Sequence, residues 1–303
     1  AWGTVMIHYF VTERQAGPIR HFLETTAKPL VGRVAVVTYE MLLSGRVEVP
    51  EQTGTYIFTN LGTVRRMEPQ ARAAIEALHD RLLESRGPGR VLNDPVRSLL
   101  RYDLLRRLHE RGINGFQAYR TSGPVEGLRY PAFIRDEFRS HFKELTLAQN
   151  PQQYGALLNG LTWQQGTRAG LITVEFCDTA GPDGLYRKYG AFVVGGRIVP
   201  RHVFVSRDWS VRNVDLVDPA HIAAELDYLD SNAHEPALLE CARLAGISYG
   251  RIDYSLLDGR PQVWEINTNA AFVSLQASVE RQAGLDRFVA NFADAMLALD
   301  PEG

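Results

Sequence analysis

The sequence lacks several features that would each place a protein in a particular class. It has two cysteines in 303 residues, Cys177 and Cys241, which are too few for a disulfide framework. No apolar run reaches the length that crosses a bilayer. The N-terminal segment lacks the basic start and long apolar core of a secretory signal. We therefore expect a reducing, cytoplasmic setting and no contact with a membrane.

Excess charge and the usual nucleotide loops are also missing. The formal net charge is -2, from 33 basic and 35 acidic residues, which gives no basis for bulk attraction to nucleic acid. The sequence contains neither Gly-x-Gly-x-x-Gly nor a Walker-type loop, so the usual glycine loops do not hold a nucleotide here. It also shows no internal repeat. The oligomeric state stays open, and a homodimer is the commonest soluble assembly.

The first third of the chain alternates strand and helix patterns. At 45% apolar residues, the chain can bury a large core and divides into two or three lobes. We expect strands at residues 4–11, 33–42, 54–60 and 90–92, with helices at 18–26 and 68–85. Strands that alternate with helices favour a parallel sheet, so residues 1–92 are predicted to form an α/β lobe.

The middle of the chain opens on Asn93-Asp94-Pro95. Either Asn93 or Asp94 can cap a helix, and Pro95 suits its first turn. The helix is expected to reach about Arg111, with leucines inward and Arg101 on an arginine-rich outer face. Short strands at 116–119 and 131–135 and a helix at 151–165 are expected to follow.

The last part of the chain favours antiparallel strands with helices to one side. A buried strand at 171–177 precedes two strands, 186–194 and 197–205, joined by Gly195-Gly196, which is a hairpin signal. Helices are expected at 219–229, 235–245 and 285–299. The predicted fold class is therefore α/β followed by α+β.

A second hairpin carries the clearest chemical signal. Residues 252–257 and 262–266 flank Asp258-Gly259, a strong turn signal. Asp253 and Glu265 can then stand opposite one another, and Glu265 and Asn267 project from the same face of their strand. Two carboxylates and one amide suit Mg²⁺ held together with substrate phosphates. The alternative is that these are solvated charges on an edge hairpin.

These segments resemble the ATP-grasp superfamily, and within it the RimK-like and glutathione-synthetase-like carboxylate–amine ligases. The resemblance covers residues 93–269. It rests on the helix entry at 93–95 with the turn at 111–114, the strand 131–135, the hinge-like 174–177, and Asp253 with Glu265-Ile266-Asn267. It implies an N-terminal lobe at 1–92, a small lobe with a lid at 93–170 and a C-terminal lobe at 171–303, with the nucleotide between the last two.

The resemblance also implies a reaction, in which ATP phosphorylates a carboxylate and an amine then displaces the phosphate. The acid and the amine acceptor belong to a small molecule or a peptide. The metal is Mg²⁺, with Mn²⁺ as an alternative, held by Asp253, Glu265 and Asn267.

The same resemblance assigns the remaining site residues. Arg135 is expected to contact phosphates, with Arg101 as a less secure second contact. Either Arg187 or Lys188 is expected at the γ-phosphate, because their side chains face opposite ways. Glu175, Phe176 and Cys177 are expected to flank adenine, and Asp178 or Asp183 to hold the ribose. Asn213 is expected to border the acceptor pocket. His202 is a weaker candidate for substrate contact, since it more often just packs.

The sequence also departs from the family pattern. The lid is usually rich in glycine, but residues 136–143 contain none, and two usual lysines are replaced by arginine or missing. A ligase is therefore the leading hypothesis. The alternatives are a nucleotide-binding protein with weak or lost catalysis that acts as a sensor or partner, a kinase acting on a non-carboxylate acceptor, and an α/β protein with no ATP site.

Overall fold

A four-stranded parallel sheet forms the N-terminal lobe. The computed structural model describes residues 7–51, 53–122, 125–138, 145–211, 216–269 and 279–299. The sheet order is β2-β1-β3-β4, and all its pairings are parallel, as the alternating pattern predicts. The strands are β1 (Ile7–Val11), β2 (Val34–Thr38), β3 (Thr55–Phe58) and β4 (Val91–Leu92).

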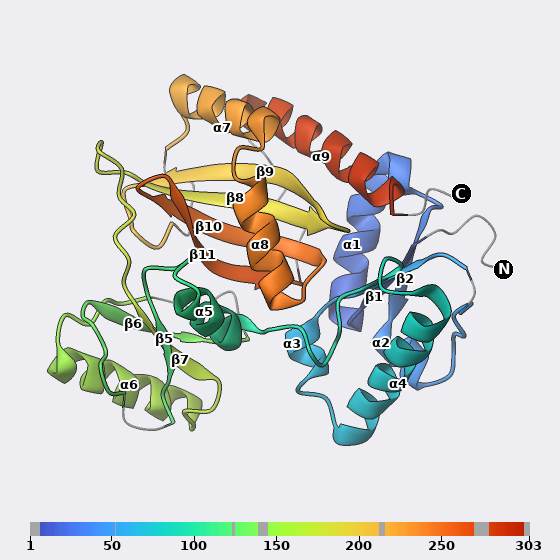
Figure 1. The fold of residues 1–303 in the computed structure, drawn as a ribbon, viewed down its shortest axis with the longest axis horizontal. Helices are drawn as coiled ribbons and strands as arrows, with labels where there is room; N and C mark the ends of the chain where they lie inside the picture. The colour runs from blue at the N-terminus through green and yellow to red at the C-terminus, as the bar shows by residue number, and fades with distance from the viewer. Residues whose placement is uncertain are drawn as a thin grey trace.

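Helices cover both faces of this sheet. Ile7 and Tyr9 pack with α1 (Glu13–Thr25) and with the C-terminal helix α9 (Gln282–Leu297). Phe10 and Tyr56 pack with α4 (Pro69–Arg86) in a second cluster. Short helical turns complete the lobe: η1 (Lys28–Leu30), α2 (Tyr39–Leu43) and α3 (Leu61–Val64). Because α9 packs against this sheet, the two ends of the chain share one core (Figure 1).

The predicted strand at 33–42 is wrong in its second half. The strand ends at Thr38, whose hydroxyl accepts a hydrogen bond from the Met41 backbone N–H at 3.2 Å and so caps α2. An apolar run suits a buried strand and a buried helical turn equally, and this cap decided between them.

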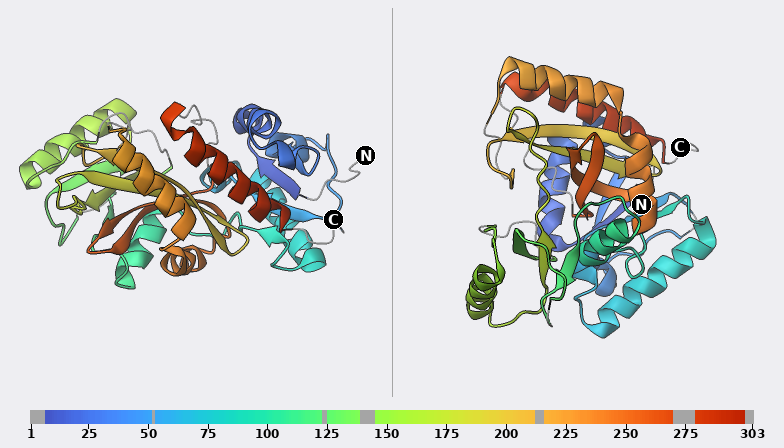
Figure 2. Two further views of the ribbon diagram at one scale, coloured as in Figure 1. Left: turned by 90° about the horizontal axis from the view of Figure 1, so that it is seen from above. Right: turned by 60° about the vertical axis from the view of Figure 1, so that its left-hand side comes forward.

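The small lobe is a three-stranded antiparallel sheet in the order β5-β7-β6. Its strands are β5 (Ala118–Arg120), β6 (Ala132–Asp136) and β7 (Leu171–Glu175), and α6 (Pro151–Gln165) packs on β6. The sequence division assigns β7 to the last lobe, but β7 is the central strand here. This sheet lies apart from the N-terminal sheet in Figure 1 and in the left view of Figure 2.

The large antiparallel sheet has the order β11-β10-β8-β9. It consists of β8 (Tyr186–Val194), β9 (Arg197–Ser206), β10 (Tyr249–Leu257) and β11 (Arg260–Asn267). Both predicted hairpin turns are confirmed: Gly195 and Gly196 have φ of 55° and 89°, and Asp258 and Gly259 have 50° and 76°. Two consecutive positive φ values are what a type I′ turn requires.

One face of the large sheet is covered by helices, and the other is only partly covered. Ala191, Val193 and Ile252 face α5 (Arg101–Glu110), α7 (Pro219–Ser231) and α8 (Glu235–Ala245). On the opposite face Phe192 and Val194 pack under α9, which follows the short turn η2 (Val279–Arg281). The remaining part of that face carries the polar side chains described below. None of the helices in the described ranges has the length and apolar character needed to span a bilayer.

The expected helix from residue 93 begins later than predicted, because Asn93 has another role. Asn93 has a φ of 66° and is 3% exposed. Its amide donates to the carbonyls of Phe58 and Tyr249 at 2.8 Å and accepts from the backbone N–H groups of Ser248 and Tyr249 at 2.9 and 3.0 Å. Asp94 caps the turn that follows, and α5 starts only at Arg101. One side chain thus ties the end of β3 to the start of β10.

We expect Asn93→Ala to lower the free energy of unfolding by about 2–4 kcal/mol, because four buried backbone groups lose their partner. Urea denaturation measures the loss. Asn93→Gly is the matched control, since glycine removes the same bonds but relieves the positive φ. A loss below about 0.5 kcal/mol in both variants would contradict a bridging role for Asn93.

Candidate active site

Four strands place a row of four residues on the partly open face of the large sheet. Across the sheet, His202 of β9 pairs with Gly190 of β8, Gly190 with Asp253 of β10, and Asp253 with Glu265 of β11. Directly opposite residues project from the same face of a sheet. The expectation that Asp253 and Glu265 stand opposite one another is therefore confirmed by the register. Both acids are buried, with exposed fractions of 5% and 8%.

Arginines accompany both acids. Arg251 makes two bonds to Asp253, at 2.7 and 2.9 Å. Arg101 forms an ion pair with Glu265, and the guanidinium of Arg135 lies 3.8 Å from the same carboxylate. A buried carboxylate needs such partners, because desolvation disfavours its charged form.

The predicted position of Arg101 on the outer face of its helix is wrong. Arg101 is 8% exposed and donates to the backbone carbonyls of Asp136 and Glu137 at 2.7 and 3.0 Å. Burial and the like charge of Arg135 lower the pKa of Arg101, although a guanidinium keeps its proton at neutral pH. Its partner Glu265 belongs to a strand distant in sequence, which the helical periodicity of its own segment does not reveal.

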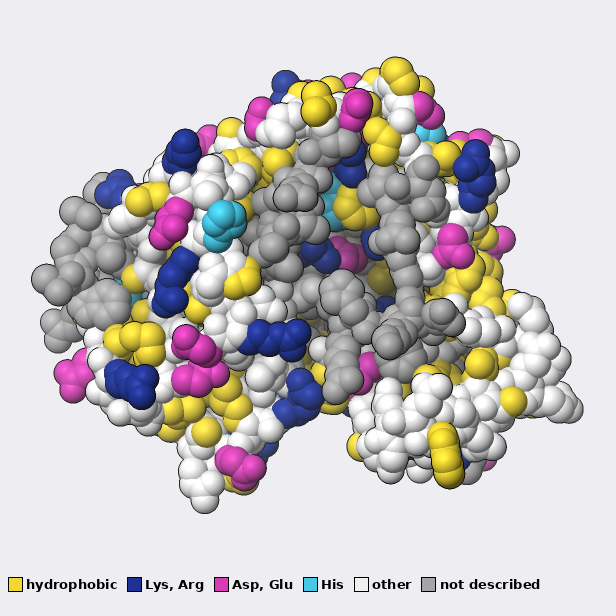
Figure 3. Space-filling model, turned by 180° about the vertical axis from the view of Figure 1, so that it is seen from behind, with side chains coloured by type: hydrophobic (Ala, Val, Ile, Leu, Met, Phe, Trp, Pro, Cys, Tyr) yellow, Lys and Arg dark blue, Asp and Glu magenta, His cyan; other side chains and the backbone are white. Residues whose placement is uncertain are grey.

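A pocket adjoins the acids and extends to the end of β7. It collects six of the residues proposed from the sequence: Arg135, Phe176, Cys177, Lys188, Asp253 and Glu265. Seven further residues complete its wall: Phe133, Leu145, Trp209, Ser210, Val211, Ser255 and Trp264. The acids and cations thus lie at one end of a cavity whose other walls are largely aromatic. In the space-filling view, basic, acidic and histidine side chains are visible inside a hollow of the surface (Figure 3).

The aromatic wall was not anticipated. Trp209 lies edge-on to Phe176 with ring centroids 5.5 Å apart, and 5.1 Å from Phe133. Trp264 stacks on Phe116 at 4.6 Å and donates to the Ser255 hydroxyl at 3.0 Å. The register passes from Asp253–Glu265 to Tyr254–Val263, which leaves Trp264 as an extra residue in a bulge. A bulge re-aims a side chain, and simple alternation cannot predict this.

Lys188 and Arg187 point to different places, as adjacent residues on a strand do. Lys188 lines the pocket and donates to the Val211 carbonyl at 2.6 Å. Arg187 instead bonds Asp183 at 2.5 and 3.0 Å, and neither residue belongs to the pocket wall. The Arg187 guanidinium holds the pKa of Asp183 well below its usual range. The suggested roles of Arg187 at a phosphate and Asp183 at a ribose have no support from this placement.

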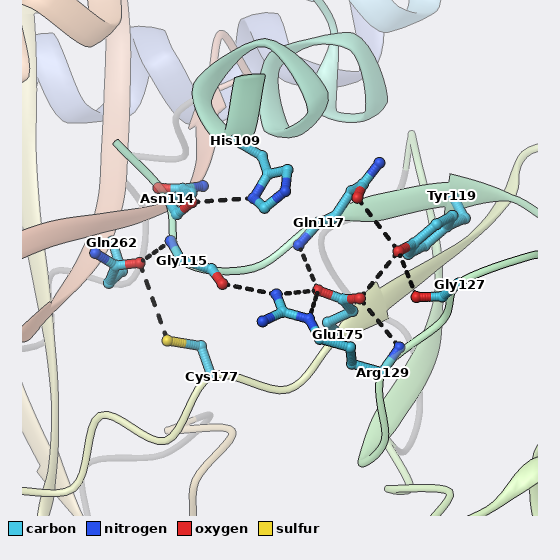
Figure 4. Close-up of polar contacts among 10 residues, drawn as sticks. All are labelled: His109, Asn114, Gly115, Gln117, Tyr119, Gly127, Arg129, Glu175, Cys177 and Gln262. Atoms are coloured by element: carbon cyan, nitrogen blue, oxygen red, sulfur yellow. Dashed lines mark hydrogen bonds and ion pairs between the residues drawn. The ribbon is translucent and has the colours of Figure 1, made fainter. Parts of the chain in front are cut away.

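Glu175 is buried and surrounded by hydrogen-bond donors of the small lobe (Figure 4). Its carboxylate accepts from the backbone N–H groups of Gln117 and Arg129, from the Tyr119 hydroxyl and from the Arg129 guanidinium. Burial raises the pKa of Glu175, but these hydrogen bonds outweigh it and lower the pKa overall. The side chain therefore holds the small lobe together beside the pocket, while the neighbouring Phe176 and Cys177 line the pocket itself.

The remaining residues that the sequence proposes for the site lie outside the pocket wall or outside the residues that the structure describes. Asp178 accepts from the Ala180 backbone N–H at 3.1 Å in a local turn. The amide oxygen of Asn267 accepts from the Asn269 backbone N–H at 2.8 Å, two residues beyond Glu265. Asn213 and residues 139–143 of the glycine-free segment lie outside the described residues.

Arg251 lies two residues before Asp253 on β10, so the alternation of side chains along a strand predicts that the two share a face, as Glu265 and Asn267 do on β11.

No protein-family model matches the sequence, and no curated protein matches it. Solved structures do match it over nearly their whole length. D-alanine–D-alanine ligase from Bacillus anthracis, complexed with ATP, is 12% identical with a TM-score of 0.51, over 98% of this chain and 99% of that one. The ATP-grasp ligase PsnB, complexed with precursor peptide PsnA2 and AMPPNP, is 11% identical with a TM-score of 0.56, over 98% and 97%.

The chain has the ATP-grasp fold. D-cycloserine synthetase DcsG shares it at 15% identity and a TM-score of 0.53, over 96% of this chain and 99% of that one. The resemblance inferred from the sequence is thus confirmed at the level of the fold. In this fold the pocket lies between the small sheet, which supplies Phe133 and Arg135, and the large sheet, which supplies the two acids.

We expect Glu175→Gln to lower the stability of the protein by about 1–3 kcal/mol at pH 7, because the charge-assisted bond to Arg129 is lost. The lowered folded-state pKa means that Glu175 stabilises the fold above its ordinary pKa of 4.5. That contribution disappears as the pH falls through the folded-state value. Urea denaturation between pH 3 and pH 7 tests this: the gap between the two proteins should narrow toward low pH. A gap independent of pH would show that the charge of Glu175 is not responsible.

Proposed function

We propose that this chain is an ATP- and Mg²⁺-dependent ligase that joins a carboxylate to an amine. The observation that supports it most directly is the pocket itself, in which two buried carboxylates and two cations lie beside an aromatic wall. Solved structures that share the fold include a D-alanine–D-alanine ligase complexed with ATP, a D-cycloserine synthetase and an ATP-grasp ligase.

The charges around the acids suit a nucleotide. Asp253 and Glu265 have four cationic neighbours: Arg135 and Lys188 in the pocket wall, and Arg101 and Arg251 bonded to the acids. Four positive charges against two negative ones leave a surplus of about two. That surplus matches the charge of a nucleoside triphosphate that carries one divalent cation, and opposite charges at close range favour binding. The aromatic side chains Phe176, Trp209 and Trp264 offer apolar faces to the base.

The residues also fit a metal ion, but one that arrives with phosphates. Within the described ranges no cluster of three or more His, Cys, Asp and Glu side chains is arranged for a metal. Asp253 and Glu265, with the amide oxygen of Asn267, are hard donors of the kind that Mg²⁺ prefers. When bound, Mg²⁺ would offset charge on the phosphates. The surrounding arginines disfavour a bare cation, so we infer that these residues take the metal as its nucleotide complex.

The chain's own residues would act mainly by position and charge. Lys188 is fixed by its bond to the Val211 carbonyl, so it can present a positive charge to a phosphate without a large entropy cost. Arg135 can bind phosphate oxygens through two N–H groups. The γ-phosphoryl group would pass to a substrate carboxylate with release of ADP. The amine would then form a C–N bond as the C–O bond to phosphate breaks.

A second candidate is a nucleotide-binding protein without turnover. The glycine-free sequence at residues 136–143 favours it, as do the bonds that already link both acids to arginines. Incubation with ATP, Mg²⁺ and pools of carboxylic acids and amines separates the two. A ligase forms ADP together with an amide product, whereas the second candidate binds nucleotide without release of ADP.

We expect the nucleotide analogue AMPPNP to raise the melting temperature by a few degrees with Mg²⁺ present, and Mg²⁺ alone to leave it unchanged. Glu265→Gln should abolish the dependence on Mg²⁺, because the acid pair loses one donor. This variant also leaves Arg101 without its carboxylate, so the fold is weakened too. Glu175→Gln is the control, since it breaks a pair between a buried acid and an exposed arginine outside the pocket. Equal shifts in both variants would exclude Glu265 from the metal site.

Cys177 reports on occupancy of the pocket. Burial raises the pKa of its thiol to about 11, so alkylation by iodoacetamide should be slow at pH 7.5 and should accelerate as the pH rises. Mg²⁺ with AMPPNP should slow the reaction at least tenfold, because Cys177 lines the pocket. Mass spectrometry of the labelled peptide measures this, and the buried Cys241 serves as the internal control. Unchanged labelling of Cys177 would place the nucleotide elsewhere.

A further inference from the structure

A second polar group, Arg201 and His202 of β9, lies on the same face of the large sheet as the two acids. The row of paired residues continues from Glu265 and Asp253 through Gly190 to His202. Neither His202 nor its neighbour Arg201 belongs to the pocket wall. With strands about 4.8 Å apart, His202 lies roughly 10 Å across the sheet from Asp253. A group at this place would meet the far end of a nucleotide held at the acids.

A bulge in β9 explains why Arg201 and His202 act together. His202 pairs with Gly190 and Pro200 pairs with Ala191, so Arg201 is the extra residue and has no opposite partner in β8. The guanidinium of Arg201 lies 4.6 Å from the ring centroid of Phe288. Phe288 packs on Phe192, which belongs to the same face as Gly190. The bulge has therefore turned Arg201 toward the face that carries His202 and the acids.

Of the three arginines Arg201, Arg251 and Arg281, two are paired with a carboxylate. Arg251 is bonded to Asp253, and Arg281 is paired with Glu225. Arg201 forms no ion pair or hydrogen bond within the described part of the chain, and its carbon framework packs on an aromatic ring. Burial and the nearby charges of Arg251 and Arg281 lower the pKa of Arg201 to about 9. Arg201 is half-buried, and its nearby carboxylate, Glu225, is already bonded to Arg281. An anionic ligand would therefore stabilise this guanidinium.

His202 adds an uncharged hydrogen-bonding group beside this cation. It is 4% exposed, and both ring nitrogens are without a partner among the described residues. Gly190 makes room for the ring, since a Cβ at that position would lie 2.5 Å from the His202 ring. Burial and the charges of Arg201, Arg251, Lys188 and Arg281 lower the pKa of His202. A neutral imidazole can donate one hydrogen bond and accept another.

We propose that Arg201 and His202 form the subsite for the carboxylate of the acid co-substrate, with Arg201 binding the carboxylate and His202 a neighbouring uncharged polar group. This inference rests on the proposed ligase function. It adds residues and a substrate chemistry to it: a carboxylic acid that carries a hydroxyl or amide next to the acid group. An ammonium at that place would be repelled by the surrounding arginines. The subsite would hold the acid at the His202 end of the row, where it would meet the far end of a nucleotide held at Asp253 and Glu265.

The test uses the full chain with Mg²⁺ and AMPPNP and three probes at constant ionic strength: glycolate, acetate and inorganic phosphate. Binding is followed by thermal stabilisation. We expect glycolate to bind more tightly than acetate, and Arg201→Gln to weaken both at least tenfold. Arg197→Gln is the matched control, because Arg197 is exposed on the same strand and its loss removes the same charge. Arg201→Lys should restore part of the affinity and shows whether the glutamine variant fails for reasons of folding.

His202→Phe keeps the aromatic ring and removes both nitrogens, so it should remove the preference for glycolate over acetate. Preserved preference would overturn the role of His202. Equal affinity in Arg201→Gln and Arg197→Gln, or no carboxylate binding by the unchanged protein, would overturn the subsite. If inorganic phosphate binds and AMPPNP displaces it, the subsite is also overturned, since Arg201 would then belong to the nucleotide site. The AMPPNP shift measured without probes tests the proposed function separately, so the two failures can be told apart.

Discussion

The structure depends on the neutralisation of two carboxylates that lie side by side inside the protein. Asp253 and Glu265 face one another across neighbouring strands and are almost fully buried. Two like charges at this distance would repel each other strongly in a medium of low dielectric constant. The chain offsets them with Arg251 from the same strand and Arg101 from a helix of another segment. Helix α5 is thereby connected to the large sheet through the site itself.

Two β-bulges adapt the regular sheet to this task. One turns Trp264 into the wall of the pocket, and the other turns Arg201 toward the face that carries the acids. A regular antiparallel sheet alternates its side chains strictly, which would separate Trp264 from Glu265 and Arg201 from His202. Because a bulge adds one residue to one strand, neighbouring residues can serve one face. Bulges are therefore the local means by which this sheet concentrates polar and aromatic groups in one place.

Patterns of short range were read correctly from the sequence. The helices at Pro151–Gln165 and Glu235–Ala245, the parallel N-terminal sheet and both two-residue hairpin turns were predicted. The opposition of Asp253 and Glu265 followed from the turn between them. Two errors arose where a partner distant in sequence decided the outcome. Asn93 became a bridge between β3 and β10 instead of a helix cap, and Arg101 was drawn inward by Glu265.

The sequence by itself determined most of the strands and helices and the pairing of the acid hairpin, because turn chemistry and residue periodicity act over a few neighbouring residues. Only the tertiary structure decided which cations accompany the acids, which of Arg187 and Lys188 reaches the pocket, and where Trp209, Trp264 and Arg201 point. Those outcomes depend on desolvation and on contacts between residues far apart in the sequence, such as Arg101 with Glu265 and Arg129 with Glu175. Long-range packing and burial, which no local pattern encodes, therefore assembled the candidate site.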